Sequence, residues 1–240
     1  MLAHRGLALD APENTLLAFA AAVGMGITHI ETDVHASRDG VAVISHDPQL
    51  DRVAGIAGRV DALSMSQLRR VDLGHEQGFV SLAEALDVFP ETRFNIDIKS
   101  ADAVAGTVAA IRAAKAVDRV LVTSFSEARR RAAVRQLPGV ATSASSSVFA
   151  AALAAGKAGA TPLLRRILRG VDAVQVPESY SGVSITTGSM ISRLHSAKVE
   201  VHVWTVNDAP AMHRLLDLGV DGIVTDRADI ALGVLAARAL

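Results

Sequence analysis

Three carboxylates in this sequence are spaced in a way that suits the binding of a cation. Glu31 and Asp33 lie two residues apart in the segment 29–35, HIETDVH, and alternate side chains of a β-strand point to the same face. Asp97 lies near the end of a following strand-like run, 94–99. Three oxygen ligands suit a hard divalent cation, Mg²⁺ or Ca²⁺, better than they suit zinc. The sequence therefore predicts a metal site at these carboxylates.

Two basic residues, Arg5 and Lys99, follow predicted strands near the carboxylates. One interpretation is a buried cluster in which the two cations neutralise the carboxylates without a metal. Three carboxylates facing two cations would still repel one another, and a divalent ion relieves that repulsion. The same two cations could instead bind an anionic substrate, for which phosphate is the obvious candidate, and both roles can coexist.

Two histidines, His4 and His46, lie at the ends of predicted strands beside charged or polar residues. Histidine titrates near neutral pH and is the commonest general acid or base. A lone histidine more often has a structural role, but two histidines flanking a carboxylate trio favour catalysis. We therefore expect His4 and His46 to act as an acid/base pair.

The other histidines and the arginine runs lack such a constellation. His29 and His35 share the strand face of the carboxylates, but neither is expected to be catalytic. The remaining histidines are interpreted as surface or packing residues; these are His75, His195, His202 and His213. The arginine-rich segments 129–131 and 165–169 are interpreted as solvated helix faces.

The composition is that of a globular protein and excludes several classes. Of the 240 residues, 50% are hydrophobic and 20% charged, and the net charge of −1 argues against a nucleic-acid binder. The absence of cysteine excludes disulfides, a thiol nucleophile and a zinc–thiolate site. No signal peptide is recognisable, and the longest apolar stretch, 148–156, is too short to span a bilayer. We expect a cytoplasmic enzyme without a stable membrane anchor; the sequence does not determine its oligomeric state.

Short β-branched runs alternate with Ala- and Leu-rich helical segments along the chain. This alternation predicts a parallel sheet, and about eight units in ~250 residues match a (β/α)₈ TIM barrel, with a doubly wound sheet as the alternative. The chain is expected to form a single domain over residues 1–240. The predicted strands are Leu2–His4, His29–Val34, Val41–Ser45, Phe94–Lys99, Val120–Ser124, Ala141–Ala144, Ala173–Val176, Val199–Trp204 and Gly222–Thr225.

Local signals place helix ends and one insertion. Asn14, Ser81 and Asn207 are predicted N-caps, and glycines at 24 or 26 and at 219 are predicted helix stops. The run 41–45 follows the second strand so closely that the two should form a hairpin, which gives a small insertion after the second barrel strand. In a barrel of this kind, catalytic side chains gather at the carboxyl ends of the strands.

The motifs, in this order, resemble the glycerophosphodiester phosphodiesterase family. The resemblance covers nearly the whole chain, and the combination of motifs is specific although each alone is weak. The matching pieces are AHRG at 3–6, PENT at 12–15, ETDVHASRDGVAVISHD at 31–47, NIDIK at 95–99, VHVWTVND at 201–208 and GVDGIVTD at 219–226.

The resemblance implies a TIM barrel that hydrolyses small glycerophosphodiesters to glycerol 3-phosphate and an alcohol. In this picture the 2-hydroxyl of the substrate attacks phosphorus and expels the alcohol, and water then opens the cyclic phosphate. Residues 13 and 14 would support the first loop. The implied site is one divalent cation on Glu31, Asp33 and Asp97, acid/base catalysis by His4 and His46, phosphate binding by Arg5 and Lys99, and a glycerol or leaving-group wall at Trp204.

Three positions depart from the pattern of the family. Asp97 occupies a metal position that is usually Glu in the family. Its side chain is one methylene shorter, which affects the choice between Mg²⁺ and Ca²⁺. The TD-x-P motif reads Thr225 to Ala228 without proline, and Lys198 stands where a glycine is expected.

Two other functions stay open from the sequence. The enzyme could act on lysophospholipids in the manner of a lysophospholipase D. The low aromatic content, 3%, argues against a lipid substrate, and so does the expectation that the site has no apolar flap. The chain could also be a catalytically inactive barrel that binds phosphorylated ligands.

Overall fold

A computed structural model describes residues 1–180 and 182–238. The strands are β1 Leu2–His4, β2 His29–Ala36, β3 Ala42–Ile44, β4 Arg93–Ile98, β5 Val120–Thr123, β6 Ala141–Thr142, β7 Ala173–Val176, β8 Ser179–Tyr180, β9 Val183–Ser184, β10 Glu200–Val203 and β11 Gly222–Thr225. The helices are α1 Leu16–Gly24, α2 Asp51–Ala54, η1 Val60–Ala62, α3 Met65–Leu68, α4 Leu82–Val88, α5 Ala103–Ala113, η2 Val117–Arg119, α6 Glu127–Val134, α7 Ser146–Lys157, α8 Thr161–Ile167, α9 Gly188–Ser196, α10 Ala209–Asp217 and α11 Ala228–Arg238.

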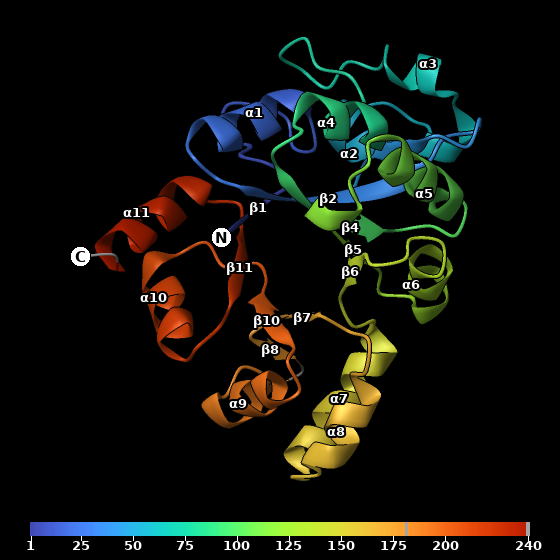
Figure 1. Cartoon of the computed structure of the whole chain (residues 1–240). Coiled ribbons are helices and arrows are strands. Elements are labelled where there is room, and N and C mark those ends of the chain that lie inside the picture. Colours follow the sequence, from blue (N-terminus) through green and yellow to red (C-terminus); the bar gives the residue numbers. More distant parts are fainter. Residues whose placement is uncertain (181, 239–240) are drawn as a thin grey trace.

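Parallel strands form a ring with helices outside it, which confirms the predicted barrel (Figure 1). Neighbours pair in the order β6-β5-β4-β2-β1-β11-β10-β7. The ring closes between β6 and β7 through two backbone hydrogen bonds. The amide of Ala144 donates to the carbonyl of Ala173 at 2.9 Å, and the amide of Asp172 donates to the carbonyl of Thr142 at 2.8 Å. The carboxyl ends of all eight strands therefore face one end of the barrel.

The insertion after the second barrel strand is also confirmed. β3 pairs antiparallel with β2, and the chain then forms α2, η1 and α3 before α4 returns to the barrel. This segment has a small core of its own, which includes Leu50, Val60, Leu68 and Phe79. The insertion therefore packs as a unit beside β2 and carries the loop of His46.

One hairpin was not predicted. The two-residue strands β8 and β9 pair antiparallel between β7 and α9, with Ser179 opposite Ser184 and Tyr180 opposite Val183. Both strands are exposed, so neither carries the alternation of apolar and polar residues that identifies a half-buried strand.

Two predicted N-caps were wrong by one residue. Thr15, not Asn14, caps α1 by accepting from the amide of Ala18, and Asp208, not Asn207, caps α10 by accepting from Ala211. Ser81 caps α4 as predicted, within a capping box. No helix in residues 1–180 and 182–238 has the length and apolar character needed to cross a bilayer.

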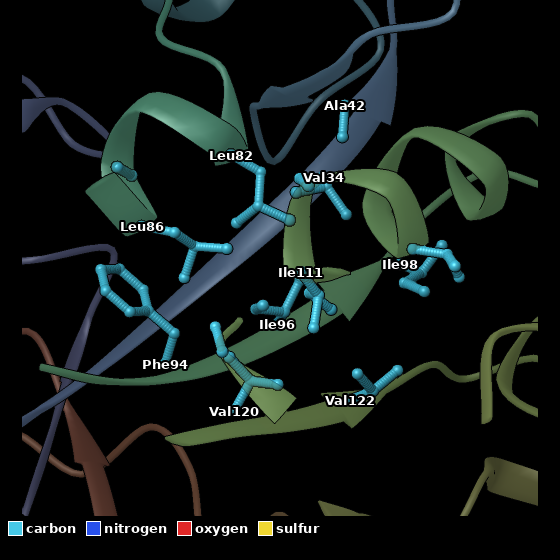
Figure 2. Close-up of a cluster of buried hydrophobic side chains, with 14 of the residues drawn as sticks. Val34, Ala42, Leu82, Leu86, Phe94, Ile96, Ile98, Ile111, Val120 and Val122 are labelled. Carbon is cyan, nitrogen blue, oxygen red and sulfur yellow. The ribbon is translucent and has the colours of Figure 1, made fainter. Parts of the chain in front are cut away.

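The main core lies between the outer face of the strands and the helices (Figure 2). Val34 from β2 and Ile96 and Ile98 from β4 point toward α4 and α5, where they meet Leu82 and Ile111. Because strand side chains alternate, the residues between them, such as Asp33 and Asp97, must point into the barrel. Packing of the apolar face thus places the carboxylates inside.

Lys198, which replaces an expected glycine, adopts a left-handed backbone conformation with φ +60°. The turn before β10 is thus retained even though a residue with a Cβ occupies a position that favours glycine.

The position of α5 against the β2–β3 turn depends on a close approach at Gly106. An added methyl there would lie 2.6 Å from the carbonyl oxygen of Gly40 and 2.7 Å from the amide nitrogen of Ala42. We expect Gly106→Ala to lower the free energy of unfolding by about 1–3 kcal/mol, because two backbone segments must separate. Gly233→Ala in α11 is the matched control, since its methyl would meet no described atom within 4 Å. Urea titrations should show it neutral or stabilising by up to about 1 kcal/mol; equal effects of the two changes would contradict the prediction.

Candidate active site

The three predicted metal ligands meet at the carboxyl end of two paired strands. Glu31 and Asp33 come from β2 and Asp97 from β4, with Asp33 directly opposite Asp97 in the parallel register. All three side chains are buried. Lys99, just beyond β4, places its ammonium 2.8 Å from Asp33 Oδ1 and 2.7 Å from Asp97 Oδ2. The structure thus brings together the trio that the strand pattern predicted.

The charges in this cluster are unevenly balanced. Burial, reinforced by the charges of Asp33 and Asp97, raises the pKa of Glu31 well above its usual range. Burial also raises the pKa of Asp97, because its pairing with Lys99 only partly compensates. For Asp33 the ammonium of Lys99 and the guanidinium of Arg5 outweigh burial and lower the pKa. Three carboxylates thus share two cations, and the charged form of Glu31 is the one that its surroundings disfavour most.

The donor set fits a hard divalent cation. Among the described residues, three buried acceptor oxygens in the site have no hydrogen-bond partner: Glu31 Oε2, Asp97 Oδ1 and Asn95 Oδ1. Asn95 lies opposite Glu31 in the β2–β4 register, so its amide oxygen faces the same space. In the described part of the chain no group of three acidic or histidine side chains is arranged to hold a metal as it stands. The ammonium of Lys99 lies between two of the carboxylates that would bind one.

His4 is paired with a carboxylate that is distant in sequence. Its Nδ1 lies 2.6 Å from Asp226 Oδ1, and its Nε2 lies 3.8 Å from Glu31 Oε2. Since a carboxylate only accepts, Nδ1 carries the proton and Nε2 faces the site. The hydrogen bond from His4, together with one from Asn207 at 2.8 Å, lowers the pKa of Asp226 despite partial burial. Asp226 therefore fixes the tautomer and orientation of His4.

Asp226→Asn is expected to lower kcat by about tenfold to a hundredfold with little change in KM, because an amide at this position can donate to Nδ1 and favour the other tautomer. Turnover of a small phosphodiester over a range of substrate concentrations checks this. Asp229→Asn is the matched control, because Asp229 pairs with Arg227 outside the site. Equal kcat values for the two variants would contradict the assigned role of Asp226.

His46 is held on both sides. Its Nδ1 donates to Asp47 Oδ1 at 2.7 Å, and its backbone carbonyl accepts from His35 Nε2 at 3.2 Å. Arg52 of α2 donates to the other oxygen of Asp47. Burial alone would raise the pKa of Asp47, but the bonds from Arg52 and His46 hold it below the usual range. His35, on the charged face of β2, thus supports the loop of His46.

Glu13 links the insertion to the first barrel loop. Its Oε1 accepts from Arg52 Nη2 at 2.6 Å and from Arg5 Nη1 at 3.0 Å. Arg5 Nε also lies 3.3 Å from Asp33 Oδ2. In this arrangement Arg5 and Lys99 pair with carboxylates, which is one of the two roles expected from the sequence; their role on a phosphate stays a prediction.

Asn14 contacts the carboxylate cluster itself. Its side-chain amide donates to Asp33 Oδ2 at 3.3 Å and its amide oxygen accepts from Thr32 at 2.8 Å. The PENT segment therefore orients a proposed metal ligand as well as supporting the loop.

A cavity of about 740 Å³ opens above these groups. Trp204 lines it, and its ring packs edge-to-face on Phe125 with centroids 6.1 Å apart; its role at the glycerol or leaving group stays a prediction. α7 and the β8–β9 hairpin add Phe149, Tyr180 and Val183 to the wall. The expectation that the site has no apolar flap was wrong, since this hairpin supplies one.

Several functional residues were missed from the sequence. Asp226 and Asn207 lie within motifs of the family, TD-x-P and VND, but nothing local indicates that they orient His4. Arg52 lies in the insertion without any motif, 39 residues from its partner Glu13. Only the folded barrel brings these groups to the site.

Comparisons with known proteins agree over the whole chain. The model of the glycerophosphoryl diester phosphodiesterase family matches residues 4–230. A Mycobacterium tuberculosis protein named probable glycerophosphodiester phosphodiesterase 2 is 44% identical over 239 residues, which cover 99% of this chain and 90% of that protein. A glycerophosphodiester phosphodiesterase of Bacillus altitudinis is 28% identical over 249 residues, covering 98% and 97%.

Solved structures share the fold. A phosphodiesterase of Oleispira antarctica, in complex with the product sn-glycerol-3-phosphate, has a TM-score of 0.82 at 23% identity, covering 98% of this chain and 96% of that one. A glycerophosphodiester phosphodiesterase of Agrobacterium tumefaciens has a TM-score of 0.79 at 24% identity, covering 98% of both chains.

Proposed function

Since this chain belongs to the glycerophosphoryl diester phosphodiesterase family, we propose that it hydrolyses glycerophosphodiesters to glycerol 3-phosphate and an alcohol, using a divalent cation and two histidines. Membership of the family makes the chain an enzyme, a phosphoric diester hydrolase. The proposed use of a cation and two histidines rests on one arrangement of side chains. Two imidazoles bind carboxylates, His4 with Asp226 and His46 with Asp47, and both lie beside a carboxylate cluster that has oxygens without a hydrogen-bond partner. The Oleispira antarctica structure, with product bound in a related barrel, supports the same substrate class.

The two imidazoles suit the two proton transfers of the reaction. Attack by the substrate 2-hydroxyl on phosphorus needs a base that removes its proton, and the departing alkoxide needs an acid. His4 and His46 each bind a carboxylate through Nδ1, which leaves Nε2 to exchange a proton. Opening of the cyclic phosphate by water then reverses the roles of the two groups.

A divalent cation, Mg²⁺ or Ca²⁺, would be held by Glu31, Asp33 and Asp97, with the amide oxygen of Asn95 facing the same space. When bound, such an ion offsets the negative charge of the phosphodiester and polarises its P–O bonds. Lys99 and Arg5 would contribute positive charge to the non-bridging phosphate oxygens, because both lie at the edge of the same cluster.

One assay tests the proposal. The protein is incubated with glycerophosphocholine and Mg²⁺ or Ca²⁺, and release of glycerol 3-phosphate is coupled to NADH formation. We expect activity that both EDTA and His46→Ala abolish. Absence of product with either metal, or activity that survives both treatments, would sink the proposal.

A further inference from the structure

One buried histidine, His202, has no part in the proposed mechanism. It lies on β10 between Val201 and Val203, which pack in the core outside the strands, so its own side chain points into the barrel. Inside a barrel of this kind the layers of side chains are mostly branched and aliphatic. A buried imidazole is costly there unless its nitrogens are hydrogen-bonded. The partners of His202 therefore show what its ring does inside the barrel.

Both ring nitrogens of His202 have a partner. Nε2 lies 3.0 Å from Glu200 Oε2, and Nδ1 lies 3.3 Å from Nε2 of Gln175 on the neighbouring strand β7. A carboxylate only accepts, so Nε2 carries the proton of the neutral ring. Nδ1 is then an acceptor, and Gln175 must donate to it through its amide nitrogen. Glu200 thus fixes, through His202, the orientation of an amide inside the barrel.

Gln175 also lines the cavity above the barrel. The charged lining groups of this cavity come from residues 4–99, and residues 123–205 line most of the other side. In the described part of the chain no donor reaches the amide oxygen of Gln175, whose nitrogen is bonded to His202. The oxygen therefore faces the cavity as a hydrogen-bond acceptor.

The role of Gln175 as an acceptor is fixed, unlike that of its uncharged polar neighbours. Those neighbours, among the described residues on this side of the cavity, are all hydroxyls: Thr123, Ser124, Ser145, Ser146 and Thr205. A hydroxyl rotates and either donates or accepts, whereas the carbonyl oxygen of an amide only accepts. A few polar groups of fixed character are what orient a ligand in a pocket.

Gln175 lies across the barrel from the carboxylate cluster. In the closed ring β7 is the fourth neighbour of β2 in either direction, so Gln175 is opposite Glu31 and Asp33. Trp204, two residues after His202, lines the same side of the cavity. A phosphodiester bound at the carboxylates therefore extends one of its two alcohol groups toward Gln175 and Trp204.

We propose that Gln175 is a specificity-determining residue whose amide oxygen accepts a hydrogen bond from a substrate hydroxyl, and that His202 is the positioning residue that holds this amide. The inference rests on the proposed function and adds a requirement to it. Besides the 2-hydroxyl that attacks phosphorus, the substrate presents a second hydroxyl that donates. Glycerol supplies one at its position 1, and a polyol leaving group supplies another.

The first test replaces this hydroxyl by fluorine, which is of similar size but has no proton to donate. One arm compares glycerophosphocholine with its 1-deoxy-1-fluoro analogue. The other arm compares the 3-hydroxypropyl and 3-fluoropropyl esters of glycerol 3-phosphate, which differ in the leaving alcohol. At about pH 8, where an ordinary imidazole is neutral, we expect kcat/KM to favour the hydroxyl by about tenfold or more in at least one arm. That arm identifies the hydroxyl that Gln175 binds.

Gln175→Leu removes the acceptor, and Gln136→Leu is the matched control at an exposed position after α6, outside the cavity. Gln175→Leu should reduce the preference for the hydroxyl to about twofold or less, and Gln136→Leu should leave the preference as it is. Fluorine also alters the chemistry of the substrate itself, but that effect is the same in both variants and cancels in the comparison. Absence of a preference in both arms, or a preference that survives Gln175→Leu, overturns the inference.

Glu200→Lys tests the role of His202 without a change in the core, because the side chain of Glu200 is 65% exposed. An ammonium only donates, so it favours the tautomer of His202 that has its proton on Nδ1. Gln175 then turns its oxygen toward Nδ1 and its amide nitrogen toward the cavity. The preference for the hydroxyl should fall to about a third or less, whereas Glu91→Lys, exposed just before β4, should not change it. If His202 were merely structural, Glu200→Lys would affect all substrates alike, and an unchanged preference would refute its positioning role.

A binding measurement separates this inference from the proposed function. Trp204 is the only tryptophan and lines the cavity, so its fluorescence reports occupancy. With Mg²⁺ present, the ligands are glycerol 3-phosphate and its 1-deoxy-1-fluoro analogue in one arm, and 3-hydroxypropyl and 3-fluoropropyl phosphate in the other. Fluorine should raise Kd by about tenfold or more in one arm, and Gln175→Leu should remove that difference. This result would support the hydroxyl site even if no diester were hydrolysed, and equal Kd values in both arms would overturn it even if hydrolysis occurred.

Discussion

Replacement of His4 by Ala is expected to lower kcat by about two to four orders of magnitude, the range for losing one general acid or base. The imidazole sits between Asp226 and Glu31, 2.6 Å from one carboxylate and 3.8 Å from the other, so its Nε2 faces the charged side of the cavity. The substrate should still bind through the cationic groups, so KM should change little. Steady-state kinetics with glycerophosphocholine measure both constants.

His75→Ala is the matched control for this prediction. His75 lies exposed in the loop before α4, away from the cavity, and its removal should leave kcat within about twofold. A loss of tenfold or less in His4→Ala would show that His4 is not the acid/base group, and a loss in both variants would point to a general effect on the fold.

The strand pattern predicted both the barrel and the face that carries the site. Ile30, Thr32 and Val34 are fully buried, which forces the alternate residues Glu31 and Asp33 inward. The alternation of side chains therefore carried information on the site as well as on the sheet. Every strand predicted from the sequence is present, with ends that differ by at most two residues.

The errors in the helix caps have a common physical cause. Asn14 and Asn207 each precede a residue, Thr15 or Asp208, that is itself a good N-cap. In the folded chain both asparagine side chains bond elsewhere, to Asp33 and to Asp226. Local propensity does not distinguish the two candidates, because long-range contacts decide between them.

The residues that orient the two histidines, Asp226 and Arg52, could not be predicted from the sequence for a different reason. Asp226 reaches His4 across 222 residues, only because β11 pairs with β1 when the barrel closes. Arg52 is only five residues from Asp47, but it reaches Glu13, 39 residues away, only because the insertion packs beside the barrel. The roles of such groups become visible once the topology is known.

The aromatic and aliphatic residues that line the cavity could not be foreseen, because they carry no pattern in the sequence. Tyr180 and Val183 lie on strands of two residues each, too short for a periodic signal, and Phe125 is a single aromatic residue in a loop. Low aromatic content suggested a polar substrate. Four of the eight aromatic residues nevertheless line this one cavity: Phe125, Phe149, Tyr180 and Trp204.

Removal of divalent metal is expected to lower turnover by at least about a hundredfold, because a bound cation contributes several kcal/mol to a phosphoryl transition state. A second readout does not depend on activity. Glu31 Oε2 and Asp97 Oδ1 are buried without a hydrogen-bond partner among the described residues, so a cation that binds them should stabilise the fold. Mg²⁺ or Ca²⁺ at a hundred times Kd should add about 2.7 kcal/mol to the free energy of unfolding, seen as a rise in Tm.

The effect of Glu31→Gln on Tm distinguishes two interpretations of the cluster: a metal site, or carboxylates neutralised by Arg5 and Lys99 alone. Burial and the neighbouring carboxylates raise the pKa of Glu31, so its charged form is costly in the metal-free fold. The neutral amide should therefore raise the Tm of the metal-free protein while it removes most of the further rise that metal gives. Glu76→Gln, in an exposed loop, should alter neither value. If Glu31→Gln lowered the metal-free Tm, or kept the full metal response, the carboxylate of Glu31 would be a structural partner of the two cations and not a ligand.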